Sequence, residues 1–323
     1  MNIKKDKQRY KTWYRELRKF GNQYNIHKIG VALSGGADSI TLAHALLKAG
    51  FDIIALHCNF NLRGDESWRD QKFTERFCTE HNIPLIIKII DTQQYIREHS
   101  GKSLEMACRE TRYGWFKEMM LEKGLDRIAV GHNADDNIET FFINLLRGCG
   151  TSGLKGMVED NGTIWRPLLK SHRNRILEYI KENGLNYIID SSNLENDFRR
   201  NFLRNEIIPR LKKEWKGFDK AFDMTLRNIN SENKIIEKAV SSALPTSTSP
   251  LSVETILQFP DPQLLIRRFI SDLSPFTTTP DEILMAIKAN KPKIKRWTLK
   301  KGSIRLQNGR LFKENDGGCD FNH

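Results

Sequence analysis

The residues best suited to chemistry begin with the hexapeptide Ser34-Gly35-Gly36-Ala37-Asp38-Ser39. It follows the apolar run 28–33 and precedes an amphipathic stretch, which predicts a turn between a strand and a helix. Glycines let backbone N–H groups close on a pyrophosphate, and the start of a helix adds a favourable partial charge. Asp38 is suited to hold magnesium, and Ser39 to donate its hydroxyl to a phosphate. The alternative is an ordinary glycine turn. The loop lacks the Gly-Lys-Ser/Thr ending of a Walker A loop, so we expect no transfer of the γ-phosphate.

A second group of polar residues follows another predicted strand. His132 ends that strand, and Asp136 and Glu139 lie three residues apart on one face of the next predicted helix. Paired carboxylates in a crevice suit an ammonium ligand and can accept a proton when an amine attacks. The alternative is a solvated helix start, where the helix dipole favours acidic residues.

Two arginines lie one turn apart in the predicted helix 103–123. Arg109 and Arg112 are placed to face phosphates, and Glu105 is placed to hold Arg109 as an i,i+4 pair. Outward-facing salt bridges are the alternative. Polar residues of the loop 57–70 are equally suited to contact a nucleobase or to close the loop; they are Asn59, Asn61, Arg63 and Gly64.

Short apolar segments alternate with longer amphipathic ones through the first 146 residues. Strands are predicted at 28–33, 52–57, 84–90 and 127–132, and helices at 9–26, 39–48, 68–81, 103–123 and 135–146. This alternation indicates βαβ units and an α/β fold with a doubly wound parallel sheet. Ligands of such sheets bind beyond the carboxyl ends of the strands, so residues 34–39, 57–63 and 132–139 should meet in one crevice.

The remainder of the chain has a different pattern. Residues 174–243 are predicted to be largely helical, and a polar, proline-bounded break follows at 245–250. Further helices are predicted at 252–258, 263–273 and 281–289, and a strand or hairpin at 297–312. We therefore expect a catalytic domain at 1–215 and a smaller α+β module at 216–323, bridged by helices within 200–240.

Positive charge is concentrated in the second half. Residues 1–160 carry 24 basic and 21 acidic side chains, whereas residues 161–323 carry 28 and 19, so the halves contribute +3 and +9 to the net charge of +12. No acidic residue lies between Lys288 and Lys313. This excess of positive charge favours a polyanionic partner such as RNA. We also expect RNA phosphates to be contacted by Asn193, Arg199, Arg200, Asn201 and Arg204.

The five cysteines are scattered and never spaced as Cys-x-x-Cys. This spacing predicts no disulfide framework and no zinc or iron–sulfur site, and it is typical of reduced thiols in the cytoplasm. No apolar run reaches the length that a membrane span needs.

The strand–SGGADS–helix unit resembles the PP-loop of the N-type ATP pyrophosphatases. Later stretches resemble, in order, those of the tRNA(Ile)-lysidine synthetase family; they are NFNLRGDESWRD at 59–70, LEMACRETRY at 104–113, GHNADDNIET at 131–140, LLRG at 145–148, RPLL at 166–169, DSSN at 190–193 and RNFLRNEIIP at 200–209. The resemblance covers about residues 28–210, and it implies a PP-loop fold. It is thin beyond residue 215, where the chain resembles short family members with one C-terminal module.

The resemblance also implies a reaction in two steps. ATP adenylates the C2 oxygen of the wobble cytidine in the CAU anticodon of tRNA(Ile), and the ε-amine of free L-lysine then displaces AMP, which changes codon recognition from AUG to AUA. ATP and magnesium are the implied cofactors, and tRNA(Ile) and lysine the partners. The residues expected to be catalytic are Asp38, Asp136, Glu139 and Arg109. Those expected to bind ATP are Ser34 to Ser39, Arg112 and His132, with Asp38 also holding the metal.

Two other functions remain to be weighed. A PP-loop tRNA thiolase would use the same ATP loop, but it usually needs paired cysteines or a cluster, which the absence of Cys-x-x-Cys disfavours. A catalytically idle RNA-binding protein on the same scaffold is disfavoured because Asp38, Asp136 and Glu139 are intact. The sequence leaves the oligomeric state open, a homodimer included.

Overall fold

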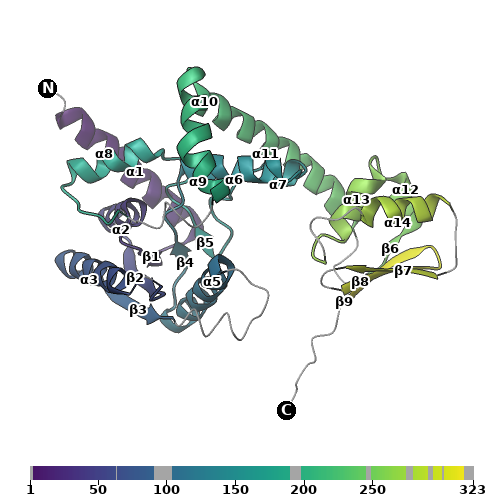
Figure 1. Cartoon of the computed structure of the whole chain (residues 1–323), viewed down its shortest axis with the longest axis horizontal. Coiled ribbons are helices and arrows are strands. Elements are labelled where there is room, and N and C mark those ends of the chain that lie inside the picture. Colours follow the sequence, from purple (N-terminus) through teal and green to yellow (C-terminus); the bar gives the residue numbers. More distant parts are fainter. Residues whose placement is uncertain are drawn as a thin grey trace, which may run out of the picture. The chain divides into compact units, whose positions relative to one another are not determined.

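A computed structural model describes residues 3–62, 64–90, 104–189, 198–244, 249–273, 279–289, 294–299 and 302–315 (Figure 1). The chain divides into two compact units. The first consists of residues 1–144 and 156–218, and the second of residues 145–155 and 219–323. The segment 145–155, which includes the short helix α7 (Thr151–Leu154), thus belongs to the second unit although it lies between two parts of the first.

The first unit is built on a five-stranded parallel sheet in the order β3-β2-β1-β4-β5. Its strands are β1 (Lys28–Ala32), β2 (Asp52–Asn59), β3 (Leu85–Ile89), β4 (Arg127–Ala129) and β5 (Ile164–Trp165). The predicted α/β class and the four predicted strands are confirmed. β5 was not predicted, because a two-residue strand is too short to produce a recognisable apolar pattern.

Helices follow the predicted strands in the predicted order. They are α1 (Ile3–Tyr24), α2 (Ala37–Ala49), α3 (Asp65–Glu80), α5 (Leu104–Lys123), α6 (Ala134–Leu146), α8 (Arg173–Glu182), α9 (Phe198–Phe202) and α10 (Ile208–Glu214). A π-helical turn, Leu203–Ile207, joins α9 to α10. The long helical stretch expected from residue 174 is therefore interrupted, since 183–189 is not helical and 190–197 lies outside the described residues.

Alternate residues of the strands pack into two separate cores. Ile29 and Val31 of β1 belong to a core that includes apolar residues of α1, α2 and α8. Ala32 of the same strand packs against the other core, which contains Trp115 and Phe116 of α5. Because successive side chains of a strand point to opposite faces, the sheet has helices on both faces, as a doubly wound fold requires.

The second unit contains a four-stranded antiparallel sheet in the order β6-β9-β8-β7, accompanied by helices. The strands are β6 (Leu251–Ser252), β7 (Ile294–Leu299), β8 (Gly302–Gln307) and β9 (Arg310–Asn315). The helices besides α7 are α11 (Phe218–Ala243), α12 (Val253–Gln258), α13 (Pro262–Phe269) and α14 (Thr279–Lys288). Apolar residues of α12–α14 and of the strands form one core, which confirms the predicted small α+β module. In the described part of the chain, no helix is both long and apolar enough to span a membrane.

Candidate active site

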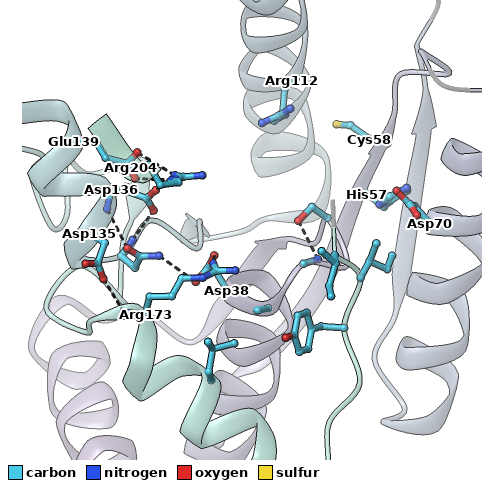
Figure 2. Close-up of a pocket in the computed structure, with 18 of the residues that line it drawn as sticks. Asp38, His57, Cys58, Asp70, Arg112, Asp135, Asp136, Glu139, Arg173 and Arg204 are labelled. Atoms are coloured by element: carbon cyan, nitrogen blue, oxygen red, sulfur yellow. Dashed lines mark hydrogen bonds and ion pairs between the residues drawn. The ribbon is translucent and has the colours of Figure 1, made fainter. Parts of the chain in front are cut away.

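The crevice lies where the direction of the chain across the sheet reverses. β2 and β3 follow on one side of β1, whereas β4 and β5 lie on its other side. The loops after β1 and β4 therefore diverge, which opens a site at the carboxyl edge of the sheet. A cavity of about 850 Å³ there is lined by residues of all three predicted stretches, 34–39, 57–63 and 132–139 (Figure 2).

Two glycines allow the backbone to approach closely at this edge. Gly35 has a φ of +88°, in the left-handed region that other residues rarely adopt. A Cβ added to Gly131 would lie 3.2 Å from the Cβ of Asp38 and from the backbone N of Ser39. The end of β4 can therefore pack directly against the start of α2.

Ser39 shapes the loop between β1 and α2. Its side chain is buried, and its Oγ accepts the N–H groups of Ser34, at 3.2 Å, and Gly35, at 3.1 Å. The same Oγ lies 3.0 Å from the carbonyl oxygen of Gly36, to which it donates its proton. The hydroxyl that we expected to contact a phosphate is thus used within the loop.

The start of α2 has the features that favour binding of an anion. The N-cap residue, Gly36, makes no side-chain cap, and the first N–H groups of any helix lack partners within the helix. These groups and the helix dipole together favour a phosphate or pyrophosphate at Ala37 and Asp38.

Asp38 connects this helix to two other elements. Its carboxylate forms an ion pair with Arg173, the first residue of α8, and its Oδ1 accepts a hydrogen bond of 3.1 Å from Nδ2 of Asn133 (Figure 2). Burial raises the pKa of Asp38 above its ordinary value, the positive charge of Arg173 opposes that rise, and the nearby charge of Asp136 adds to it. A cation bound here would relieve the repulsion between the two carboxylates.

Asn133 and Asp136 cap the start of α6 reciprocally. The N–H of Asp136 donates to Oδ1 of Asn133, and the N–H of Asn133 donates to Oδ2 of Asp136, both at 3.0 Å. This is a capping box with aspartate in place of glutamate. We did not predict a role for Asn133, although its spacing from Asp136 carries the capping signal.

Glu139 is almost fully buried and is paired with two arginines. Arg204, in the π-helical turn, donates to both of its carboxylate oxygens at 2.6 and 2.9 Å, and Arg200 of α9 donates at 2.8 Å. Arg204 also donates to Oδ1 of Asp136 at 3.0 Å (Figure 2). We expected Arg200 and Arg204 to contact RNA phosphates, but both extend to these carboxylates. Of the two carboxylates, Asp136 is the more exposed.

Asp135 fastens two further helices to the start of α6. Its Oδ1 pairs with Nζ of Lys212 on α10 at 2.5 Å, and its Oδ2 accepts the backbone N–H of Arg173 at 2.7 Å. Burial opposes ionisation, but His172, whose Nδ1 lies 3.7 Å from the carboxylate, and hydrogen bonds from Lys212 and Arg173 hold the pKa of Asp135 well below its usual range. Asp135 is therefore a fixed negative charge that holds α8 and α10 in place.

The two predicted arginines of α5 differ in position. Arg112 reaches the cavity, with its guanidinium 5.1 Å from the centre of the Phe60 ring (Figure 2). Arg109 does not line this cavity, and its guanidinium lies 4.9 Å from the centre of the Tyr113 ring. Arg63, Asn193 and the side chain of Glu105 lie outside the described residues, so their expected contacts stay predictions.

A segment after α8 covers the loop between β1 and α2. The N–H of Ile188 donates to the carbonyl of Gly35 at 2.9 Å, and a Cβ added to Gly35 would lie 2.6 Å from Cδ1 of Ile188. Tyr187 and Ile189 also line the cavity. The sequence of 183–189 did not predict the contact with Gly35, because the two segments lie about 150 residues apart in the chain.

Cations of the second unit are partly neutralised. Arg296 and Arg305 pair with Glu314 at 2.8 and 2.6 Å, and Lys313 pairs with Asp272 at 2.9 Å. The acid-free stretch 288–313 is therefore compensated by acids outside it. Lys295 and Arg310 are exposed, whereas Lys291, Lys293, Lys300 and Lys301 lie outside the described residues.

Comparison with known proteins agrees with this fold. Residues 9–211 match the PP-loop domain family, and the chain belongs to this family of ATP-binding proteins. The chain is similar to a tRNA(Ile)-lysidine synthase of Bacteroides thetaiotaomicron, with 38% identity over 74% of this chain and 56% of that protein. It is also similar to that of Porphyromonas gingivalis strain W83, with 40% identity over 80% of this chain and 57% of that protein. The chain thus spans less than two thirds of these curated relatives.

A solved structure shares the fold. It is a U34-tRNA thiolase of Methanococcus maripaludis, with a TM-score of 0.55 and 21% identity over 68% of this chain and 78% of that one. This likeness supports the fold of the first unit.

Proposed function

We propose that the chain is a tRNA(Ile)-lysidine synthetase of the cytoplasm. In this reaction lysine is joined to C2 of the wobble cytidine of a CAU anticodon, and ATP is converted to AMP and pyrophosphate. The observation that carries the proposal is the junction of the PP-loop with the carboxylates of α6 in one crevice, in a chain similar to lysidine synthases over most of its length.

The first step places the phosphates of ATP at the start of α2. The cytidine C2 oxygen attacks the α-phosphorus, the bond from that phosphorus to the β-phosphate bridging oxygen breaks, and pyrophosphate leaves. The backbone N–H groups of Ala37 and Asp38 face the negative charge that develops on the phosphates. The guanidinium of Arg112, on α5, offsets the same charge. Donors that are fixed before the reaction stabilise such a charge without reorganisation.

The carboxylates near the loop fit magnesium in one particular way. The described residues include no cluster of three histidine, cysteine or acidic side chains that could enclose a metal. Magnesium in nucleotide sites is commonly held by one or two carboxylates together with phosphate oxygens and water. Asp38 would hold it, and bound magnesium would neutralise charge on the phosphates. The guanidinium of Arg173 must then move away from the carboxylate of Asp38.

The second step needs an acceptor for a proton. The lysine ammonium first loses one proton to solvent; the free ε-amine then attacks C2, the bond from C2 to the adenylate oxygen breaks with release of AMP, and the new C–N group loses a second proton. Asp136 is the better acceptor, because it is more exposed than Glu139. Glu139 fixes Arg204 beside Asp136, so that the ammonium of the incoming lysine meets a carboxylate in a defined position.

The partner RNA must present its anticodon as an unpaired loop, because proteins read RNA bases most readily where they are splayed from a stem. Lys295 and Arg310, two of the exposed cations of the second unit, are suited to hold phosphates of that stem.

The proposal is tested by incubating the full chain with tRNA(Ile) bearing a CAU anticodon, ATP, magnesium and radiolabelled lysine. We expect ATP-dependent label in the tRNA, and none when the wobble cytidine is replaced by uridine. Absence of label, or label that does not require ATP, would contradict it. Incorporation of sulfur in place of lysine would support the thiolase alternative.

A further inference from the structure

His132 and Arg166 form a contact that the reaction above does not use. Arg166 directly follows β5, and its Nε lies 3.2 Å from Nδ1 of His132. Its Nη1 donates to the carbonyl of Val158 at 2.8 Å, and its backbone N–H donates to the carbonyl of Glu159 at 2.7 Å. The guanidinium is therefore bonded both to the imidazole and to the carbonyl of Val158, and a third hydrogen bond anchors the main chain of Arg166.

This contact determines where the imidazole carries its proton. A guanidinium has only donors, so Nδ1 of His132 must offer its lone pair. In a neutral ring the single proton then lies on Nε2. His132 also lines a cavity of about 250 Å³ at the loop, together with Ser34, Asp38 and Arg112. The ring is thus a hydrogen-bond donor beside the phosphate site.

The surroundings also prevent the ring from becoming charged. Burial lowers the pKa of His132 to about 3, and the positive charges of Arg166, Arg200, Arg109 and Arg112 contribute to this shift. These arginines face the ring from three elements, the end of β5, α9 and α5. Asp38 also lines the smaller cavity, and its raised pKa reflects the same burial. The imidazole therefore stays neutral throughout the physiological range.

A second histidine at the same sheet edge has the opposite arrangement. Nδ1 of His57 lies 2.8 Å from the carbonyl oxygen of Leu33, which only accepts, so Nδ1 carries the proton and Nε2 has the lone pair. The two imidazoles thus have different fixed partners and different tautomers. The residue type alone does not distinguish them.

We propose that Arg166 is a positioning residue: it holds His132 as a neutral Nε2–H donor to a phosphate oxygen of the nucleotide. This inference rests on the proposed ATP chemistry for its kinetic consequence, but the tautomer itself does not. Without Arg166 the ring gains two alternatives, a rotated ring or a proton on Nδ1, and each changes the group presented to the nucleotide.

The tautomer is tested by nitrogen NMR of the full chain labelled in its histidine rings. Wild type should show a bare Nδ1 and a protonated Nε2 on His132 from pH 5 to 8. In Arg166→Met the ring should titrate with a pKa closer to 6.5. Arg127→Met is the matched control, because Arg127 is a guanidinium of the adjacent strand β4 that pairs with Asp160 at 2.9 Å; it should leave the signals unchanged. A protonated Nδ1 in wild type would overturn the proposal.

The kinetic consequence is tested by a double-mutant cycle on tRNA-dependent AMP release. Arg166→Met should slow AMP release about 10-fold when His132 is present. In a His132→Ala background the same substitution should slow it by less than about twofold. Arg166→Lys, which keeps a positively charged N–H donor group, should recover part of the rate. Equal losses in both backgrounds would show that Arg166 only supports the fold. If wild type releases no AMP, the proposed function fails, and the NMR result still decides the tautomer.

Discussion

Charged residues are arranged differently in the crevice of the first unit and on the sheet of the second. In the crevice, Asp38 and Arg173 are 135 positions apart in the chain, and Glu139 and Arg204 are 65 apart, yet each pair is in contact. Glu139 is buried, whereas Arg173 is exposed. On the sheet, Arg305 and Glu314 are nine apart on neighbouring strands, and Lys295 is exposed.

This difference indicates that charges in the crevice act individually, whereas charges on the sheet of the second unit act through their sum. A buried pair loses much when one partner is removed, because the other is left without compensation. Exposed charges are screened by water and salt, and each contributes little. We therefore expect large effects of single substitutions in the crevice, and small, additive effects on the sheet.

The largest effect is expected for Asp38→Asn. An amide is a poor ligand for magnesium, so lysine incorporation should fall by about 100-fold or more. Because burial raises the pKa of Asp38, the ionised carboxylate is unfavourable in the folded state, and thermal unfolding should show an unchanged or higher Tm. Asp52→Asn, at the exposed start of β2, is the control. Near-normal incorporation by Asp38→Asn would remove Asp38 from the reaction.

Glu139→Gln should have the next largest effect. It removes the charge that holds Arg204 and Arg200, so we expect the free energy of unfolding to fall by about 3 kcal/mol. The lysine step should slow, while the adenylated tRNA remains measurable by rapid quench.

Glu206→Gln is the matched control for that variant, since Glu206 is exposed and lies 4.0 Å from Arg210. It should change the free energy of unfolding by less than about 1 kcal/mol. If Glu139→Gln blocks adenylate formation as strongly as lysine transfer, this carboxylate serves the ATP step.

A buried histidine of α2 that does not line the crevice extends the comparison to pH. Nδ1 of His44 lies 2.7 Å from Oη of Tyr179, and burial lowers the pKa of His44 to about 4. The unfolded chain takes up a proton near pH 6.5 that the folded chain excludes. The contribution of His44 to stability should therefore be complete above pH 6.5 and fall by about 1.4 kcal/mol per pH unit toward pH 4. Urea unfolding of His44→Gln should show a smaller slope; an equal slope would assign the loss to other groups.

The smallest effect is expected on the second unit. Replacing Lys295 and Arg310 together with glutamine should weaken tRNA binding and reduce the salt slope of log affinity by about 1.5, because each phosphate contact contributes about 0.7 to 0.9. Lys48 and Lys181, near the ends of α2 and α8, are the matched control pair. An unchanged slope would indicate that the basic strands serve solubility and do not bind tRNA. ATP binding should be unaffected in either case.

The order of the elements and the meeting of three loops could be predicted from the sequence. Apolar strands alternating with amphipathic helices specify a parallel sheet, and a parallel sheet brings strand ends together. The pairing of Asp38 with Arg173 could not be predicted, because it depends on where α8 docks after an unpredicted two-residue strand. The position of Arg204 depends on a π-helical turn that has no clear sequence signal. The use of Ser39 within its loop likewise follows from backbone geometry and not from residue type.

The most direct test of the proposed function is the mass of the wobble nucleoside. Purified tRNA(Ile) transcript is incubated with the full chain, ATP, magnesium and lysine, then digested to nucleosides and analysed by mass spectrometry. The account predicts that one cytidine is replaced by a nucleoside heavier by one lysine minus one water, with AMP formed in equal amount. Unmodified cytidine, a thiolated base, or ADP as the nucleotide product would contradict it.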